Sequence, residues 1–218
     1  MSPRLNRGEY WLLLQAALHN IPLPTLFHIN VPGWDPGFNP TLNSMSHGMS
    51  PEETARTLQR LSRRGWLNLA YPFRQSGTAA CDDINTLVAE MRHGKNWKDQ
   101  LSYHLTPEGG AAWEQFACPD WDCYVDDTTS DSDANPMERC VIMTTRKELE
   151  RQVGRIRHEV DVVDSSIEID EMADWEMTYW KPPRMAWRCG LLYRERPFEG
   201  RPIFPRASNW WHSWCAWR

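Results

Sequence analysis

The segment from Ser50 to Gly65 limits the possible folds most strongly, because it carries both start and stop signals for one helix. Ser50 offers a hydroxyl N-cap, Pro51 suits the first helical position, and Glu53 can reach back to the cap. Gly65 provides a left-handed residue at the C-terminal end. Apolar residues recur at helical spacing between these ends, so the sequence predicts an amphipathic helix with one buried stripe.

Further elements are expected on both sides of this helix. Apolar residues alternate at period two over 67–73 and 101–105, which predicts two strands that pair. A short helix between them begins at Asp83, and another helix begins at Thr106. A buried helix with a cap at Asn6 precedes them all. Five prolines and two glycines between 21 and 46 break any long element there, so we expect an irregular loop.

This order of elements, over about residues 5–117, resembles the winged-helix superfamily, whose nearest well-known members are bacterial regulators of the MarR and PadR types. The motifs that carry the resemblance are LSRRGWL at 61–67 and YHLTPEGG at 103–110. The resemblance implies that 50–64 is the recognition helix and that the two strands form the wing. Two features depart from the pattern: the proline-rich stretch replaces the second helix, and an extra helix elaborates the wing.

The resemblance also implies a DNA-contacting helix face. Arg56, Arg60 and Arg63 are spaced so that they share one face, with Arg64 adjacent. One hypothesis is that these arginines contact phosphates and bases in the major groove. The other is a solvated face on which Glu52 pairs with Arg56 one turn away. The sequence leaves both open.

The rest of the chain predicts a second domain. The run at 126–136, DDTTSDSDANP, has almost no apolar residue and is interpreted as an acidic linker between domains at 1–125 and 137–218. Beyond it, strands are predicted over 140–143, near 167–169 and over 185–193, with a helix that starts at Thr145. The predicted fold class is α+β: an N-terminal winged-helix-like domain with an elaborated wing, the linker, and a small C-terminal α+β domain rich in tryptophan.

Charge is distributed unevenly along the chain. Residues 1–117 hold ten basic and ten acidic side chains, residues 118–178 hold six and seventeen, and residues 179–218 hold eight and two, which gives 0 − 11 + 6 = −5. The acidic middle would repel a polyanion such as DNA and favours a basic partner. The 13 tryptophans supply aromatic anchors of the kind found at protein interfaces. The candidate partner-binding residues are Glu168, Asp170, Glu171, Asp174, Trp175, Trp210 and Trp214.

Other kinds of site receive less support from the sequence. Cys118 and Cys123 could begin a zinc site, but no second tight pair exists, so buried free thiols are the alternative. Glu168 and its acidic neighbours could bind a divalent cation or form a solvated acidic surface. No catalytic or nucleotide-binding motif occurs, so we expect no enzyme activity and no cofactor. No signal peptide or membrane-spanning run is present, which predicts a cytoplasmic protein.

Two functions remain at this point. The first is a non-enzymatic binding protein whose acidic, tryptophan-rich surface occupies a basic surface on another protein, as an inhibitor or immunity-type antagonist would. The second is a DNA-binding winged-helix transcriptional regulator, in which the four arginines contact DNA and the C-terminal domain senses a ligand.

Overall fold

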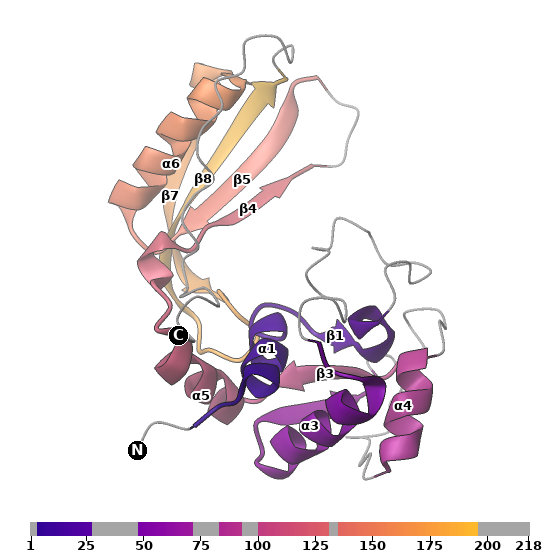
Figure 1. Cartoon of the computed structure of the whole chain (residues 1–218). Coiled ribbons are helices and arrows are strands. Elements are labelled where there is room, and N and C mark those ends of the chain that lie inside the picture. Colours follow the sequence, from indigo (N-terminus) through magenta and orange to yellow (C-terminus); the bar gives the residue numbers. More distant parts are fainter. Residues whose placement is uncertain (1–3, 28–47, 72–82, 93–99, 131–134, 196–218) are drawn as a thin grey trace. The chain divides into compact units, whose positions relative to one another are not determined.

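Residues 4–27, 48–71, 83–92, 100–130 and 135–195 are described by a computed structural model (Figure 1). The chain divides into two units, and the first comprises Met1–Phe116 together with the short segment Thr178–Lys181. The second comprises Ala117–Met177 and Pro182–Arg218. The described residues form α-helices and two antiparallel sheets, so the α+β prediction is confirmed. None of the helices in the described ranges combines the length and the apolar character needed to cross a membrane.

Helix α1 (Arg7–Gln15) begins at the predicted cap. The side chain of Asn6 accepts from the backbone N–H of Glu9 at 2.9 Å, and Glu9 Oε2 accepts from the backbone N–H of Asn6 at 3.0 Å. This reciprocal pair satisfies two backbone donors that a helix start leaves unpaired. The helix is buried on most sides, as the run of apolar residues predicts. Strand β1 (Ile21–Pro22) and the 3₁₀ helix η1 (Leu23–Leu26) follow.

Helix α3 (Pro51–Arg63) confirms the start and stop signals in the sequence. The side chain of Ser50 accepts from the N–H of Glu53 at 3.2 Å, and the Glu53 carboxylate accepts from the N–H of Ser50 at 2.8 Å. Gly65 has a φ of +71°, in the left-handed region that favours glycine. The buried face of the helix contains Ala55, Leu58 and Leu61, the predicted stripe.

The first unit contains a three-stranded antiparallel sheet in the order β1-β3-β2. The predicted pairing of β2 (Leu67–Ala70) with β3 (Ser102–Leu105) is confirmed, with Leu67 opposite Leu105. Strand β1 adds to the other side of β3 and was not predicted. Helix α4 (Ile84–Arg92) connects β2 to β3 in sequence, and α5 (Pro107–Ala117) follows β3, both as predicted.

A short segment from much later in the chain completes the first unit. We call this segment, Thr178–Lys181, the strap. The Tyr179 hydroxyl accepts from the backbone N–H of Leu105 at 2.7 Å and donates to the carbonyl of Ala16. The indole N–H of Trp180 donates to the carbonyl of Ala17 at 2.8 Å. A Cβ at Gly110 would lie 2.1 Å from the Trp180 ring, so glycine is required where α5 meets the strap.

The second unit contains a five-stranded antiparallel sheet. Its path runs from β4 (Asp126–Thr129) through β5 (Met137–Met143) and β8 (Arg184–Arg194) to β6 (Asp161–Val162), and β7 (Glu168–Trp175) also pairs with β8. Figure 1 labels β4, β5, β7 and β8. The long strand β8 lies beside β5 on one edge. Its other edge pairs with β6 and with β7. The predicted strands over 140–143, 167–169 and 185–193 are therefore confirmed, and a 3₁₀ helix, η5 (Asp164–Ser166), joins β6 to β7.

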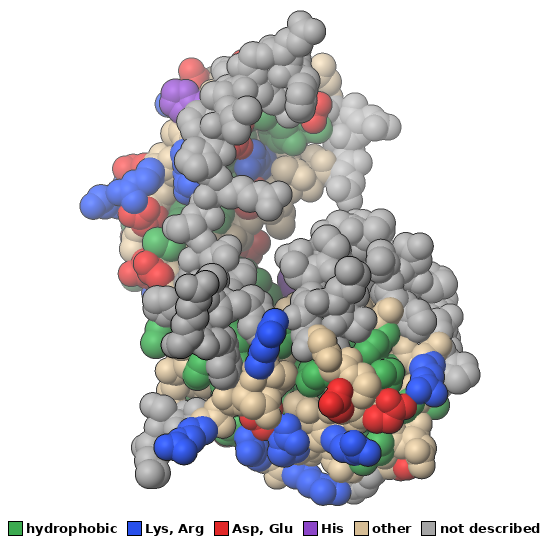
Figure 2. Space-filling model, in the orientation of Figure 1, with side chains coloured by type: hydrophobic (Ala, Val, Ile, Leu, Met, Phe, Trp, Pro, Cys, Tyr) green, Lys and Arg blue, Asp and Glu red, His purple; other side chains and the backbone are tan. Residues whose placement is uncertain are grey.

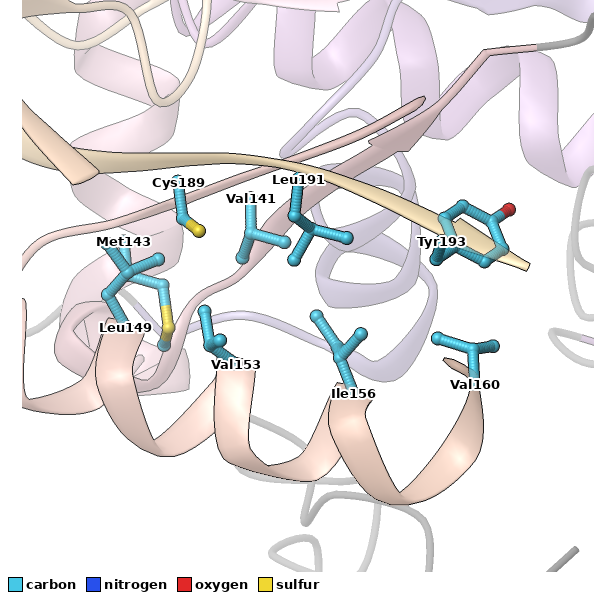
Figure 3. Packing of buried hydrophobic residues seen from close by; sticks show 9 residues of the cluster. All are labelled: Val141, Met143, Leu149, Val153, Ile156, Val160, Cys189, Leu191 and Tyr193. Carbon is cyan, nitrogen blue, oxygen red and sulfur yellow. The ribbon is translucent and has the colours of Figure 1, made fainter. Parts of the chain in front are cut away.

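Helix α6 (Arg146–Glu159) covers one face of this sheet, and Thr145 caps it as predicted, its side chain accepting from the N–H of Glu148 at 3.3 Å. Figure 3 shows apolar side chains of α6 pointing toward those of β5 and β8. The buried cluster consists of Val141, Met143, Leu149, Val153, Ile156, Val160, Cys189, Leu191 and Tyr193. Burial of this apolar surface is the main term that holds the helix to the sheet.

The predicted acidic linker is wrong over its first residues. Asp126–Thr129 is strand β4, which pairs with β5 from Asp126 opposite Ile142 to Thr129 opposite Arg139. A strand at the edge of a sheet needs no apolar side chains when its backbone is paired. Arg139 also compensates Asp127 through two hydrogen bonds of 2.8 and 2.6 Å. The unit boundary falls at Phe116, ahead of the predicted linker.

Candidate functional site

Strand β7 carries the densest group of exposed carboxylates in the described chain. Glu168, Asp170, Glu171 and Asp174 lie on it, and Glu176 follows directly; all five are exposed. Strand β7 contains no basic residue. The structure therefore places four of the predicted partner-binding residues together along one strand, in the same unit.

Asp170 differs from its acidic neighbours because it already has a cationic partner. Arg188 of β8 donates to both carboxylate oxygens, with Nη2 to Oδ2 at 2.6 Å and Nε to Oδ1 at 3.2 Å. These hydrogen bonds lower the pKa of the Asp170 carboxyl and raise the pKa of the Arg188 guanidinium. Within the described residues no ion pair engages the other carboxylates. We call these the acidic edge: Glu168, Glu171, Asp174 and Glu176.

Trp175 was predicted as a partner-binding anchor, and the structure shows that this is wrong. Its side chain is buried, with 2% of the residue exposed. The ring stacks on Tyr124, with centroids 5.9 Å apart, and the indole N–H donates to Asp126 Oδ2 at 3.5 Å. It packs with Met177 and Ala186 in a small core on this part of the sheet.

A β-bulge explains why Trp175 points into that core. Met172 lies opposite Ala186, whereas Trp175 lies opposite Arg184, so two residues of β7 face a single residue of β8. Strict alternation along a strand would put side chains three apart on opposite faces. The extra residue returns Trp175 to the face of Met172, and both contact the same core.

An exposed apolar residue that the sequence did not single out as a site lies opposite the bulge. Ala173 and Asp174 are the two residues that face Met185 of β8, and all three are exposed. Met185 is 62% exposed. Among the described residues, the other large hydrophobic side chain that is exposed is Tyr179, at 41%. Methionine is adaptable and is enriched at binding surfaces. Period-two alternation marks Met185 as a strand residue but does not predict that it is exposed opposite a bulge.

The arginines of α3 are only partly available for a ligand. Arg60 Nε donates to Glu9 Oε1 at 2.8 Å, and Arg64 donates to the same oxygen at 3.2 Å. Arg56 and Arg63 are exposed on the same helix. Figure 2 shows basic side chains around α3 with acidic side chains beside them. The sequence predicted that the arginines share a helix face, but it did not predict that the Glu9 carboxylate binds two of the four.

The expected pairing of Glu52 with Arg56 is wrong. Glu52 instead accepts from Arg92 of α4 at 2.8 Å, an ion pair in which both side chains are exposed. The reason is tertiary: α4 packs against α3 and brings its final arginine to the start of α3. Exposed pairs of this kind contribute little to stability.

The cysteines do not assemble into a metal site within the described ranges. Cys118 and Cys123 are exposed free thiols, contrary to the expectation of buried ones, whereas Cys189 is buried. The Cys123 thiol donates to Asp120 Oδ2 at 3.2 Å, and this hydrogen bond raises its pKa. No group of three potential ligands in the described part of the chain is placed to hold a metal ion, the acidic residues of β7 included.

Trp210 and Trp214, the remaining predicted partner-binding residues, lie outside the described residues. No family model, no curated protein and no solved structure matches this chain.

Proposed function

We propose that this protein is a non-enzymatic binding protein that uses the acidic edge to occupy a basic surface on a protein partner. The observation that carries the proposal is the group of exposed carboxylates at Glu168, Glu171, Asp174 and Glu176, without an ion pair among the described residues. Such a group produces a negative local potential that attracts cations and accelerates encounter with a basic partner.

The distribution of charge within the second unit supports this use. Five of the nine lysine and arginine residues described in the second unit lie on α6. These are Arg146, Lys147, Arg151, Arg155 and Arg157. Several are compensated on α6 itself, as in the pairs of Arg146 with Glu150 and of Arg151 with Glu148. Among the described residues, Arg188 is the one cation in an ion pair with a carboxylate of β7, so most of the negative charge on that strand is left uncompensated there.

Met185 supplies the apolar component that a binding surface requires. Charged groups steer association, while buried apolar contacts supply most of the energy that holds a complex together. Met185 is exposed beside Asp174 at the bulge, so an apolar contact and a carboxylate are adjacent. An inhibitor or immunity-type antagonist that masks a basic functional surface fits this combination.

The proposal is tested with a fluorescein-labelled oligolysine peptide and a labelled random DNA duplex, by polarisation at low salt. We expect the peptide to bind and to be released as salt rises. The double variant Glu171→Lys/Asp174→Lys should weaken binding by about tenfold or more. The matched control Glu159→Lys/Glu195→Lys makes the same change in net charge at two exposed positions and should change affinity by less than about twofold. Equal losses in both variants, or no peptide binding, would overturn the proposal.

The DNA-binding regulator is the second candidate, supported by the exposure of Arg56 and Arg63 on the helix that the winged-helix resemblance marks as the recognition helix. The same assay tests it. Duplex binding that falls steeply with salt and is lost in Arg56→Glu/Arg63→Glu, without peptide binding, would favour the regulator. Those two positions are chosen because Arg60 and Arg64 are bound to Glu9, and changing them would also disturb the fold.

A further inference from the structure

We propose that the partner contributes an extended basic segment that pairs with the outer edge of β7 as an additional strand. This inference rests on the proposed function and specifies how the partner is held. In the described chain β7 pairs with β8 on one side only. Alternate backbone N–H and C=O groups on the other side therefore lack a strand partner, which is the template for strand addition.

The pairing of β7 with β8 sets the length of the free edge. Glu168–Met172 runs in unbroken register with Ala186–Gly190, and the bulge begins immediately after Met172. A bulge interrupts the ladder and twists the strand. The regular part of the edge can therefore accept a segment of about five residues. Ala173 is exposed at the end of that segment, where an apolar residue of the partner could pack, and Met185 lies on β8, one strand further from the outer edge.

Charge identifies the occupant as a basic segment. Glu168 and Asp170 project from one face of β7 and Glu171 from the other, because side chains alternate along a strand. A lysine or arginine directly across from any of these carboxylates would form a favourable cross-strand pair. A segment with basic residues on both faces would match both sets.

A second copy of this chain is a poor occupant of the same edge. Antiparallel pairing of two β7 strands centred on Asp170 would place Asp170 opposite Asp170, and parallel pairing would stack each carboxylate beside its equivalent. Like charges directly across a ladder are destabilising. The acidic side chains therefore disfavour self-association through β7 and leave the edge for a partner of opposite charge.

The test uses two labelled peptides of identical charge, each of about nine lysine and valine residues with lysines at both odd and even positions, so that both faces of the strand are basic. One has ordinary amides, and the other is N-methylated at alternate residues on the edge-pairing side, so that it cannot donate backbone hydrogen bonds. We expect the ordinary peptide to bind the full chain about tenfold more tightly or better. Hydrogen exchange should show slower exchange at alternate amides of β7, with no change in β4, the opposite edge strand of the same sheet.

The outcomes separate the pairing mode from the proposed function. If both peptides bind equally and both weaken in Glu171→Lys/Asp174→Lys, the acidic edge binds basic partners but strand addition is overturned. If protection appears in β4 instead of β7, the location is overturned. If neither peptide binds, the proposed function fails as well. A free protein that sediments as a dimer, with β7 amides already protected, would assign the edge to a second copy and also overturn the inference.

Discussion

Arg60 Nε donates a hydrogen bond to Glu9 Oε1 at 2.8 Å, and this contact joins helix α3 to helix α1. Glu9 is buried, with its side chain 4% exposed, and its other carboxylate oxygen caps α1 through the backbone N–H of Asn6. Arg64 shares the same oxygen and also lies over the ring of Trp66, 5.1 Å from its centroid. One carboxylate thus closes a helix start and orders two arginines.

Replacing Glu9 with glutamine should destabilise the first unit by about 1–3 kcal/mol, because charge-assisted hydrogen bonds are lost and a cap is weakened. The larger penalty of a fully buried pair does not apply, since Arg60 and Arg64 are 43% and 41% exposed. Urea unfolding followed by circular dichroism measures the change. The control Glu52→Gln breaks the exposed pair with Arg92 and should cost less than about 0.5 kcal/mol. Equal costs for the two would refute the structural role of Glu9.

Substitution of Trp175 by alanine should mainly lower stability, whereas substitution of Met185 by alanine should mainly weaken binding. Trp175→Ala removes a ring that is 2% exposed and should lower the free energy of unfolding by about 3–5 kcal/mol. Met185→Ala removes an exposed side chain and should change stability by less than about 0.5 kcal/mol. It should nevertheless weaken binding of the lysine–valine peptide. A large stability loss for Met185→Ala would show that the residue belongs to the core.

The Asp170 carboxyl should titrate below its ordinary pKa, because hydrogen bonds from Arg188 favour its charged form. A depressed pKa means that the pair stabilises the folded state above the ordinary pKa, and that this contribution is lost as pH falls through the lowered value. Carboxyl carbon chemical shifts in an NMR titration measure it. In Arg188→Gln the pKa should move back up, and an unchanged titration curve would show that the pair does not persist in solution.

Two glycines should give opposite results when changed to alanine. A Cβ at Gly109 would lie 1.9 Å from the carbonyl oxygen of Trp66, so Gly109→Ala should displace α5 and cost about 1–3 kcal/mol. A Cβ at Gly154, inside α6, meets nothing within 4 Å. Gly154→Ala should therefore stabilise the second unit by about 0.5–1 kcal/mol, since alanine favours the helix. Thermal unfolding of both variants measures the difference, and a neutral Gly109→Ala would contradict the close approach.

The features that the sequence predicts correctly depend on neighbours within a few residues. The caps at Asn6, Ser50 and Thr145 and the left-handed Gly65 each follow from local hydrogen bonding or backbone conformation. The alternation over β2 and β3 predicts their pairing because each buries one face.

The features that the sequence does not predict depend on residues far apart in the chain. Strand β1 is only two residues long, and it is a strand because it pairs with β3, about eighty residues later in the chain. The pairing of Glu9 with Arg60 requires two helices to be packed first. The burial of Trp175 depends on a bulge, and composition and periodicity cannot place a one-residue insertion in a ladder.

The strap has a practical consequence for any attempt to divide this molecule by deletion. No single cut separates the units, since the residues at 178–181 that complete the first unit are supplied from between β7 and β8. A fragment ending at Phe116 would lose the Tyr179 hydroxyl, which accepts from the Leu105 amide. It would also lose the Trp180 indole, which donates to the Ala17 carbonyl. Truncation mapping would then record misfolding of the fragment, and point substitutions in the intact chain are the sound way to locate a binding surface.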